Sequence, residues 1–182
     1  MEIKFLSQDH KYRSPIFEVI QQTLTVNGNK IVRDVVMKSP CVVCIVHNID
    51  FDTVVLTKEF RIGTFDEELG LIAGMIDKNE QPIQAAIRET IEETGYQPVA
   101  IEFLGNSNSS TGFTNERIHH FYVQVSGDRK EQDLDSDEYI AIEEKPFKKL
   151  PYLIDSGWIQ GNHAHAAVLK AMFAGVIPGV VQ

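Results

Sequence analysis

Residues 74–96 read GMIDKNEQPIQAAIRETIEETGY, and the organisation of the whole chain follows from this segment. Apolar and small side chains recur within it at the spacing of one helical face. They are Ile83, Ala86, Ile87, Thr90, Ile91 and Thr94. The spacing predicts an amphipathic helix over residues 82–94 with this face on the core. Pro82 suits the first turn of such a helix, and Gly95 suits the position just past its end.

The polar side of the predicted helix carries three carboxylates. Glu89, Glu92 and Glu93 stand at i, i+3 and i+4, so they share one patch of the helix surface. Like charges at this spacing repel one another, and the adjacent Arg88 offsets part of that repulsion. A solvated acidic face is the commonest reason for such a stretch. The alternative is a site for a hard divalent cation, which binds through carboxylate oxygens together with substrate phosphates.

The fixed positions of this segment resemble the signature box of the Nudix hydrolases. In this sequence they read Gly74-x5-Glu80-x7-Arg88-Glu89-x2-Glu92-Glu93-x-Gly95-Tyr96. Every polar and glycine position of the box is filled at the family's spacing, and a match of this length is far more specific than a short motif. Thr90 stands where the family usually carries a bulky aliphatic residue. Because Thr90 lies on the predicted core face, we expect this departure to alter packing rather than chemistry.

The resemblance implies an α/β fold, namely an α/β/α sandwich with a mixed central sheet. It also implies hydrolysis of a nucleoside diphosphate linked to a further group, with Mg²⁺ or Mn²⁺ as cofactor. Carried over to this sequence, Glu89 and Glu93 are the first metal ligands, with Glu92 and the backbone carbonyl of Ala73 as further ones. Arg88 would orient the carboxylates, and it joins Glu92 and Glu93 in the implied catalytic set.

The remaining segments alternate between predicted strands, helices and loops. We expect strands over residues 17–26, 30–37, 41–47, 53–59, 99–104, 118–125 and 140–142, and helices over 148–155 and 163–174. We expect loops over 63–69, 105–116 and 126–138. Residues 1–40 read as extended segments, with a hairpin turn at Asn27-Gly28-Asn29.

Several features outside the box resemble the ADP-ribose pyrophosphatase branch of the family. Lys-Glu-Phe-Arg, ending at Arg61, falls where that branch has an aromatic residue and arginine at the end of a strand. The resemblance implies that Arg61 contacts phosphate or stacks on a base. The alternative is a surface arginine that pairs with Glu59 or Asp66.

Two downstream loops extend this resemblance. The segment 110–116 is similar to the loop that the branch places beside the terminal ribose, which implies substrate contacts for Gly112, Phe113 and Glu116. Residues 133–138 resemble an acidic loop that supplies a general base in some members. The base would be Asp135, Asp137 or Glu138, of which Glu138 aligns most naturally. A solvated acidic loop is the alternative.

The N-terminal segment also matches the branch, in which a β-rich extension packs across a homodimer. We therefore predict residues 1–40 as an antiparallel β extension for dimerisation and residues 41–182 as the Nudix hydrolase domain. The implied reaction is conversion of ADP-ribose to AMP and ribose 5-phosphate. Two departures, Thr111 and Gly70, replace a proline and a glutamate of the branch pattern. They keep GDP-mannose and UDP-sugars open as alternative substrates.

The composition limits the partners. The 182 residues are 43% hydrophobic and 24% charged, which is typical of a globular domain, and the net charge is −9. Such a chain repels nucleic acid and anionic membranes, so neither is expected as a partner. We expect a cytoplasmic protein whose partner is a nucleotide-sugar small molecule.

Three further alternatives remain at this stage. Cys41 and Cys44 form a C-x-x-C, but they would point to opposite faces of a strand, which favours two small buried side chains over a redox pair. A non-catalytic module that binds a nucleotide sugar would not need three repelling glutamates. An RNA 5′-end hydrolase fits the box but not the acidic balance.

Overall fold

The computed structural model describes residues 1–136 and 138–177, and the chain divides into two units. The first unit combines Met1–Pro40 with Asn108–Arg117, and the second unit holds the rest of the described chain. The sequence analysis had not associated residues 108–117 with the N-terminal segment. None of the helices in the described ranges has the length and apolar character needed to cross a membrane.

The first unit is a three-stranded antiparallel sheet, in the order β1-β2-β3. Its strands are β1 (Ile3–Arg13), β2 (Glu18–Val26) and β3 (Asn29–Met37). The predicted hairpin turn is confirmed, because Asn27 and Gly28 both have positive φ, at 49° and 81°. Residues 110–116 extend the edge of β3, where the Val36 amide donates to the Phe113 carbonyl at 2.7 Å. Among all residues of this unit, Ile20 has the one fully buried side chain.

The second unit contains the mixed sheet, in the order β10-β5-β4-β9-β8, with β6 paired to β5 and β7 to β4. The strands are β4 (Cys41–Asn48), β5 (Thr53–Arg61), β6 (Asp66–Gly70), β7 (Ile72–Met75), β8 (Pro98–Asn108), β9 (Arg117–Val125) and β10 (Ile140–Pro146). Strands β4 and β9 are parallel, whereas β4 pairs antiparallel with β5 and β7. The helical segments are α1 (Pro82–Thr94), η1 (Phe147–Lys149), α2 (Leu150–Asp155) and α3 (Asn162–Phe173).

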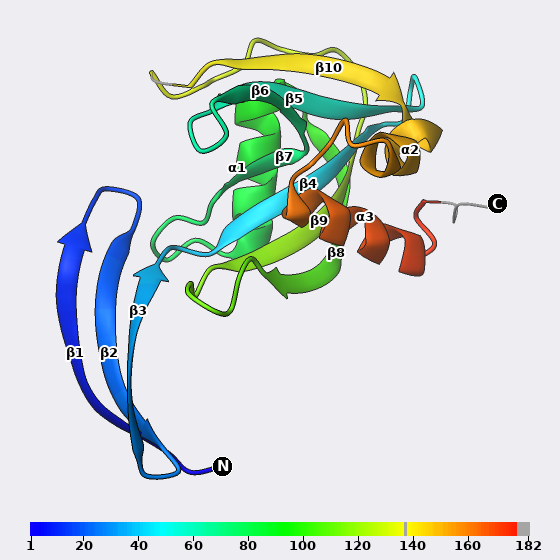
Figure 1. Ribbon diagram of the computed structural model, residues 1–182. Coiled ribbons are helices and arrows are strands. Elements are labelled where there is room, and N and C mark those ends of the chain that lie inside the picture. Colours follow the sequence, from blue (N-terminus) through cyan, green and yellow to red (C-terminus); the bar gives the residue numbers. More distant parts are fainter. Residues whose placement is uncertain (137, 178–182) are drawn as a thin grey trace. The chain divides into compact units, whose positions relative to one another are not determined.

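The central strand β4 is buried on both faces, which explains its uninterrupted apolar sequence. Val42, Cys44 and Val46 pack into the core cluster that includes α1. Val43 and Ile45 pack into the opposite cluster, with α2 and α3. Figure 1 shows α1 on one side of the sheet and α2 and α3 on the other. The predicted α/β/α sandwich with a mixed sheet is confirmed.

The two cysteines lie on opposite faces of β4, as their spacing predicts. Cys41 packs against the α2–α3 side, and Cys44 is fully buried on the α1 side. Neither of these two described cysteines is in a disulfide, and burial raises the pKa of Cys44 above its ordinary value. The arrangement supports two small packing residues rather than a redox pair.

Helix α1 has the predicted boundaries, but its predicted core face is partly wrong. Ile83 and Ile87 are 45% and 36% exposed. The buried positions are Ala85, Ala86, Glu89, Thr90, Glu93 and Thr94. Small side chains let the helix approach the sheet closely, and the same face carries two of the three carboxylates inward. Thr90 is fully buried, as predicted, and its hydroxyl donates to the Ala86 carbonyl at 2.7 Å.

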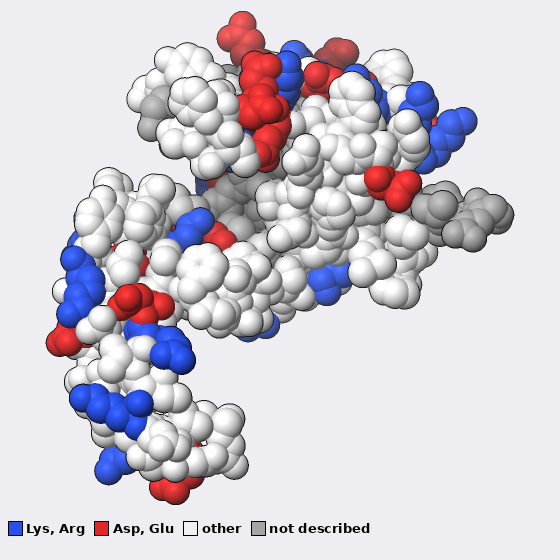
Figure 2. Space-filling view, viewed as in Figure 1, with Lys and Arg blue, Asp and Glu red and all other residues white. Residues whose placement is uncertain are grey.

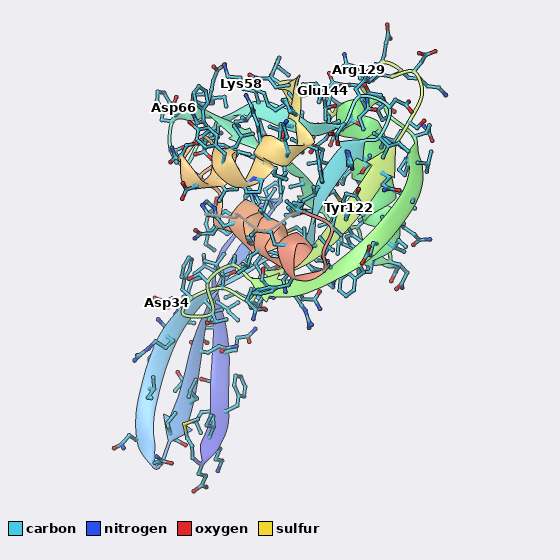
Figure 3. The ribbon with its side chains drawn as sticks, turned by 90° about the vertical axis from the view of Figure 1, so that its right-hand side faces the viewer. Asp34, Lys58, Asp66, Tyr122, Arg129 and Glu144 are labelled. Atoms are coloured by element: carbon cyan, nitrogen blue, oxygen red, sulfur yellow. The ribbon has the colours of Figure 1, made fainter. Side chains whose placement is uncertain are left out.

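Two predicted loops contain strand. Residues 63–69 include most of β6, and β8 continues to Asn108 instead of ending near residue 104. Strand β6 was missed because its exposed residues are acidic and lack apolar alternation. Its charges pair across the ladder, where Lys58 on β5 lies 2.6 Å from Glu67. Figure 3 labels Lys58 and Asp66 on these two paired strands.

Candidate active site

The carboxylate-bearing side of α1 opens on a polar cavity of about 390 Å³ in the second unit. Its described lining comes from β7, the segment after it, α1 and the acidic loop before β10. The lining residues are Gly74, Met75, Asp77, Arg88, Glu89, Glu92, Asp133, Leu134, Asp135 and Glu138. The cavity therefore joins two regions that the sequence analysis singled out separately, the box helix and the acidic loop.

Helix periodicity places two of the glutamates against the sheet. Glu89 and Glu93 are one turn apart, and their exposed fractions are only 9% and 6%. Burial, together with the neighbouring Glu92 and Glu138, raises the pKa of Glu89 to about 7, although Arg88 opposes the rise. Burial and the charge of Glu89 raise the pKa of Glu93 well above its ordinary value. Two inward-facing carboxylates of this kind need a cation or a proton nearby.

Arg88 organises the carboxylates around a single guanidinium. Its Nε and one Nη hold both oxygens of Glu80, at 2.9 and 3.0 Å. The other Nη donates to Glu89 at 2.8 Å and to Glu92 at 2.9 Å. The Met75 carbonyl accepts a further bond at 2.9 Å, so all five donors are used. Arg88 thus holds Glu80, Glu89 and Glu92 around one guanidinium, and its orienting role in catalysis stays a prediction.

Gly74 is required by the position of Glu89. A Cβ atom at residue 74 would overlap the Glu89 carboxylate. The absence of a side chain on β7 thus lets the carboxylate lie directly against the strand backbone. This explains in physical terms why the box begins with glycine.

Glu93 is the box glutamate whose carboxylate most clearly lacks a binding partner among the described residues. Its Oε2 atom is buried and has no hydrogen-bond partner in the described structure. The backbone amide of Ala73 donates a hydrogen bond to the carboxylate, which lowers the pKa and so opposes the effect of burial. A buried carboxylate oxygen without a donor is what a divalent cation would satisfy.

The carboxylates suit a hard cation, although they are not gathered around one point. Across residues 1–136 and 138–177, no three His, Cys, Asp or Glu side chains converge as a ready-made metal site. One oxygen of Glu89 and one of Glu92 are instead paired with Arg88. Oxygen chemistry, burial and the unpartnered Glu93 oxygen together fit Mg²⁺ or Mn²⁺.

The acidic loop contributes two of its three predicted base candidates to the cavity wall. Asp135 and Glu138 both line the cavity, whereas Asp137 lies outside the described residues. The Glu138 amide donates to the Asp135 carbonyl at 3.0 Å, and the Asp135 amide donates to the Glu138 carboxylate at 3.3 Å. This local turn orients Glu138 beside the box glutamates.

Arg61 lies at the end of β5 and is paired with a neighbouring acid. Its guanidinium is 3.0 Å from Glu59, the first of the two ion-pair partners considered for it. Both side chains are partly exposed, so the pair can open toward an anionic ligand at low cost. Burial raises the pKa of Glu59, with Glu138 adding to the rise.

Three predicted substrate residues, Gly112, Phe113 and Glu116, belong to the first unit. Phe113 is 54% exposed, and the space around the Gly112 Cα is open. Glu116 is mostly buried and its carboxylate is 2.6 Å from the Lys38 ammonium group. No local pattern in the sequence predicts this pairing, because Lys38 and Glu116 lie far apart along the chain.

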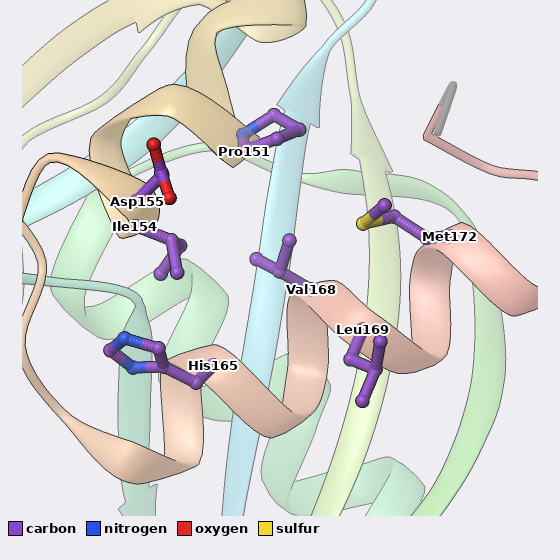
Figure 4. Close-up of a pocket in the computed structure, with 7 residues that line it drawn as sticks. All are labelled: Pro151, Ile154, Asp155, His165, Val168, Leu169 and Met172. Atoms are coloured by element: carbon purple, nitrogen blue, oxygen red, sulfur yellow. The ribbon is translucent and has the colours of Figure 1, made fainter. Parts of the chain in front are cut away.

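A second cavity, of about 460 Å³, lies between α2 and α3 (Figure 4). Apolar side chains such as Ile154, Val168 and Met172 form much of its wall, and Asp155 and His165 are its titratable residues. The smaller polar cavity is the better candidate site because it carries the carboxylates and the guanidinium.

The charge around the candidate site is strongly negative. The second unit has ten Lys and Arg against 21 Asp and Glu. Figure 2 shows acidic side chains gathered along the side of this unit where β5, β6 and β10 run. An anionic substrate would need cations to approach this surface.

Comparison with known proteins agrees with the geometry. Residues 37–161 match the NUDIX domain. The chain is 24% identical to an ADP-ribose pyrophosphatase of Bacillus subtilis (strain 168), over 86% of this chain and 85% of the relative. It is 29% identical to a GDP-mannose pyrophosphatase of Yersinia enterocolitica, over 92% and 89%. A crystal structure of an ADP compounds hydrolase has the same fold, with a TM-score of 0.79 at 22% identity over 96% of this chain and 94% of that one.

Proposed function

The chain belongs to the NUDIX domain family of pyrophosphohydrolases, and we propose that it hydrolyses the diphosphate of a nucleoside diphosphate sugar with divalent metal ions. The observation that carries the proposal is the pair of buried box glutamates, Glu89 and Glu93, beside the polar cavity. The Glu93 oxygen without a partner adds a specific place for a cation. The substrate proposed first is ADP-ribose, which would yield AMP and ribose 5-phosphate.

The residues proposed to hold the metal are Glu89, Glu92 and Glu93, with the backbone carbonyl of Ala73. Mg²⁺ is the first candidate and Mn²⁺ the second, because both prefer oxygen ligands. Bound ions would neutralise the diphosphate, polarise the attacked phosphorus and lower the pKa of a bound water. Arg88 would keep the carboxylates oriented through its contacts with Glu80, Glu89 and Glu92.

The remaining residues would position the reactants and move the proton. The carboxylate of Glu138 would accept a proton from the attacking water. The water oxygen forms a new bond to one phosphorus, and the bridging P–O bond breaks, leaving two monophosphates. Arg61 would hold a phosphate or stack on the base. In the first unit, Phe113, Gly112 and Glu116 would contact the ribose end of the substrate.

ADP-ribose is placed first because the relatives include an ADP-ribose pyrophosphatase and the branch features of the sequence agree with it. The GDP-mannose pyrophosphatase relative supports the alternative of another nucleotide sugar, including UDP-sugars. Thr111 and Gly70, which depart from the ADP-ribose pattern, favour that alternative. A non-catalytic nucleotide-sugar-binding module is the third candidate.

A panel of substrates tests the proposed function. Initial rates of diphosphate cleavage would be measured with Mg²⁺ on ADP-ribose, GDP-mannose, UDP-glucose, NADH and diadenosine polyphosphates. We expect ADP-ribose to give the highest kcat/KM. A preference for another nucleotide sugar would assign Thr111 and Gly70 to a changed pocket. Tight binding without turnover of any compound would favour the non-catalytic module.

The first unit is proposed to be a dimerisation segment. A three-stranded sheet with one fully buried side chain, Ile20, does not bury enough apolar surface to be stable alone. Its exposed apolar residues include Ile3, Phe5, Tyr12 and Ile16. A second copy of the chain would cover them, with residues 1–40 serving the dimer and residues 41–182 the hydrolase.

Light scattering after size-exclusion chromatography would test the dimer. We expect a mass of twice 20.5 kDa at micromolar concentration, and a mass of one chain would contradict the assignment. The proposed location is the cytoplasm, where the thiols of Cys41 and Cys44 would stay reduced.

A further inference from the structure

The loop that follows β9 is hydrogen-bonded to the last turn of α1, the helix that carries the box glutamates. A helix leaves its final carbonyls without partners inside the helix. Here the Glu92 carbonyl accepts a bond from the Asp133 amide at 2.9 Å. The Glu93 carbonyl accepts a bond from the side-chain amide of Gln132. The loop thus supplies hydrogen-bond donors to the last carbonyls of the helix whose side chains form the candidate site.

The same Gln132 amide reaches a second carbonyl. Its Nε2 atom also donates to the backbone oxygen of Ile140 at 3.3 Å. Ile140 is the first residue of β10, where it pairs with Glu59 on β5. The Gln132 side chain, at the start of this loop, therefore hydrogen-bonds both to Ile140, at the end of the loop, and to the backbone of Glu93.

The backbone just before Gln132 lies tightly against the helix end. Gly95 has a left-handed conformation, with φ at 73°, and its carbonyl accepts a bond from the Lys130 amide at 3.0 Å. A Cβ atom at residue 95 would collide with the Lys130 carbonyl. This close approach leaves little room for the start of the loop to shift relative to α1.

Between the two anchored ends lie the loop carboxylates of the cavity. Asp135 and Glu138 line the same cavity as Glu89 and Glu92. Burial raises the pKa of Glu93, and the charges of Glu89 and Glu138 add to the rise. Gln132 is not among the described lining residues, so it would act on the reaction through the groups that it contacts, the loop and the end of α1.

We propose that Gln132 is a positioning residue, whose amide fixes the segment carrying Asp135 and Glu138 against the metal-binding side of α1. The proposal rests on the proposed function, in which Glu138 accepts the proton. A general base contributes only when it lies within hydrogen-bond reach of the water. Release of the anchor would let the carboxylate sample positions from which it cannot take that proton.

Steady-state kinetics of Gln132→Met tests the proposal. Methionine has nearly the same length but no donor, and Gln160→Met is the matched control at an exposed glutamine between α2 and α3. We expect kcat to fall about 30-fold with KM within about twofold, since a base is worth about 10²–10⁴-fold. Gln132→Asn, which keeps the amide on a shorter side chain, should lose most of the same activity. A rise in KM of about 30-fold with kcat unchanged would overturn the proposal.

A double-mutant cycle separates positioning from general damage. In a chain that already carries Asp135→Asn and Glu138→Gln, Gln132→Met should change kcat by less than about twofold, because its effect passes through those two residues. A full additional loss in that background would show that Gln132 acts on α1 or on stability instead, and would overturn the proposal.

Hydrogen exchange makes the test independent of the reaction. In Gln132→Met the amides of Asp133 and Glu138 should exchange at least tenfold faster than in the unaltered chain, while those in the middle of α1 should not change. Unaltered exchange at both loop amides would refute the anchoring role even if the enzyme is active. Faster exchange in a protein that hydrolyses nothing would refute the proposed function alone.

Discussion

Replacement of Glu93 by glutamine is expected to lower kcat for diphosphate hydrolysis by about 10³-fold, the scale of several kcal/mol that a bound metal supplies. The side chain is 6% exposed, and its Oε2 atom has no hydrogen-bond partner among the described residues. Glutamine keeps the shape but offers one neutral oxygen, which binds a divalent cation far more weakly. The measurement is the initial rate at saturating ADP-ribose and Mg²⁺.

The stability of this variant distinguishes a functional loss from misfolding. Burial and the charge of Glu89 raise the pKa of Glu93, so its carboxyl group lowers the free energy of unfolding of the metal-free protein at neutral pH, either as a buried charge or by having to take up a proton. Glu93→Gln should therefore melt at the same temperature as the unaltered chain, or higher, when metal is chelated. The same change at Glu102, an exposed position on β8, should leave both rate and melting temperature unchanged. Near-normal turnover by Glu93→Gln would refute the metal assignment.

Gly74→Ala is expected to reduce kcat/KM by about 100-fold, the loss typical of displacing a reacting or binding group by about 1 Å. The new methyl group would occupy the place of the Glu89 carboxylate. The carboxylate is the flexible end of a side chain, so the fold can accommodate its displacement. The displaced Glu89 would give up the 2.8 Å bond from Arg88 and its place beside Glu93.

Gly63→Ala is the matched control for this variant. Gly63 lies between β5 and β6, and a Cβ atom there would contact nothing within 4 Å. Both variants should unfold within a few degrees of the unaltered chain, and only Gly74→Ala should lose activity. Comparable activity in the two variants would mean that the close contact between Gly74 and Glu89 has no role in catalysis.

The resemblance of residues 74–96 to the Nudix box implied the sandwich, and helical spacing placed the three carboxylates on one patch. The apolar run of β4 and the spacing of the box residues determine which side chains share a face. The helix boundaries were correct because Pro82 and Gly95 mark the two ends of α1. The prediction that Ile83 and Ile87 lie on the core face of α1 was wrong. Hydrophobic periodicity selects the most apolar face of a helix, whereas the face of α1 that packs on the sheet carries small side chains and two carboxylates.

The remaining features depend on contacts between distant parts of the chain. The anchoring of Glu93 by Gln132 spans 39 positions, and no local pattern marks either partner. The pairing of Lys38 with Glu116 likewise joins the end of the N-terminal sheet to a later loop. The acidic strand β6 carries no apolar alternation, and its pairing with β5 is decided by the ladder and by ion pairs such as Lys58–Glu67. These contacts can be seen in the folded structure, but the spacing of residues along the sequence does not predict them.

The most direct test of the central claim is the rate of AMP release from ADP-ribose as Mg²⁺ is titrated into the metal-free protein. We expect no release above background with a chelator present, saturable activation by Mg²⁺, and equal amounts of AMP and ribose 5-phosphate. Release at the same rate with and without metal would contradict the assignment of Glu89, Glu92 and Glu93 as a metal-binding catalytic cluster.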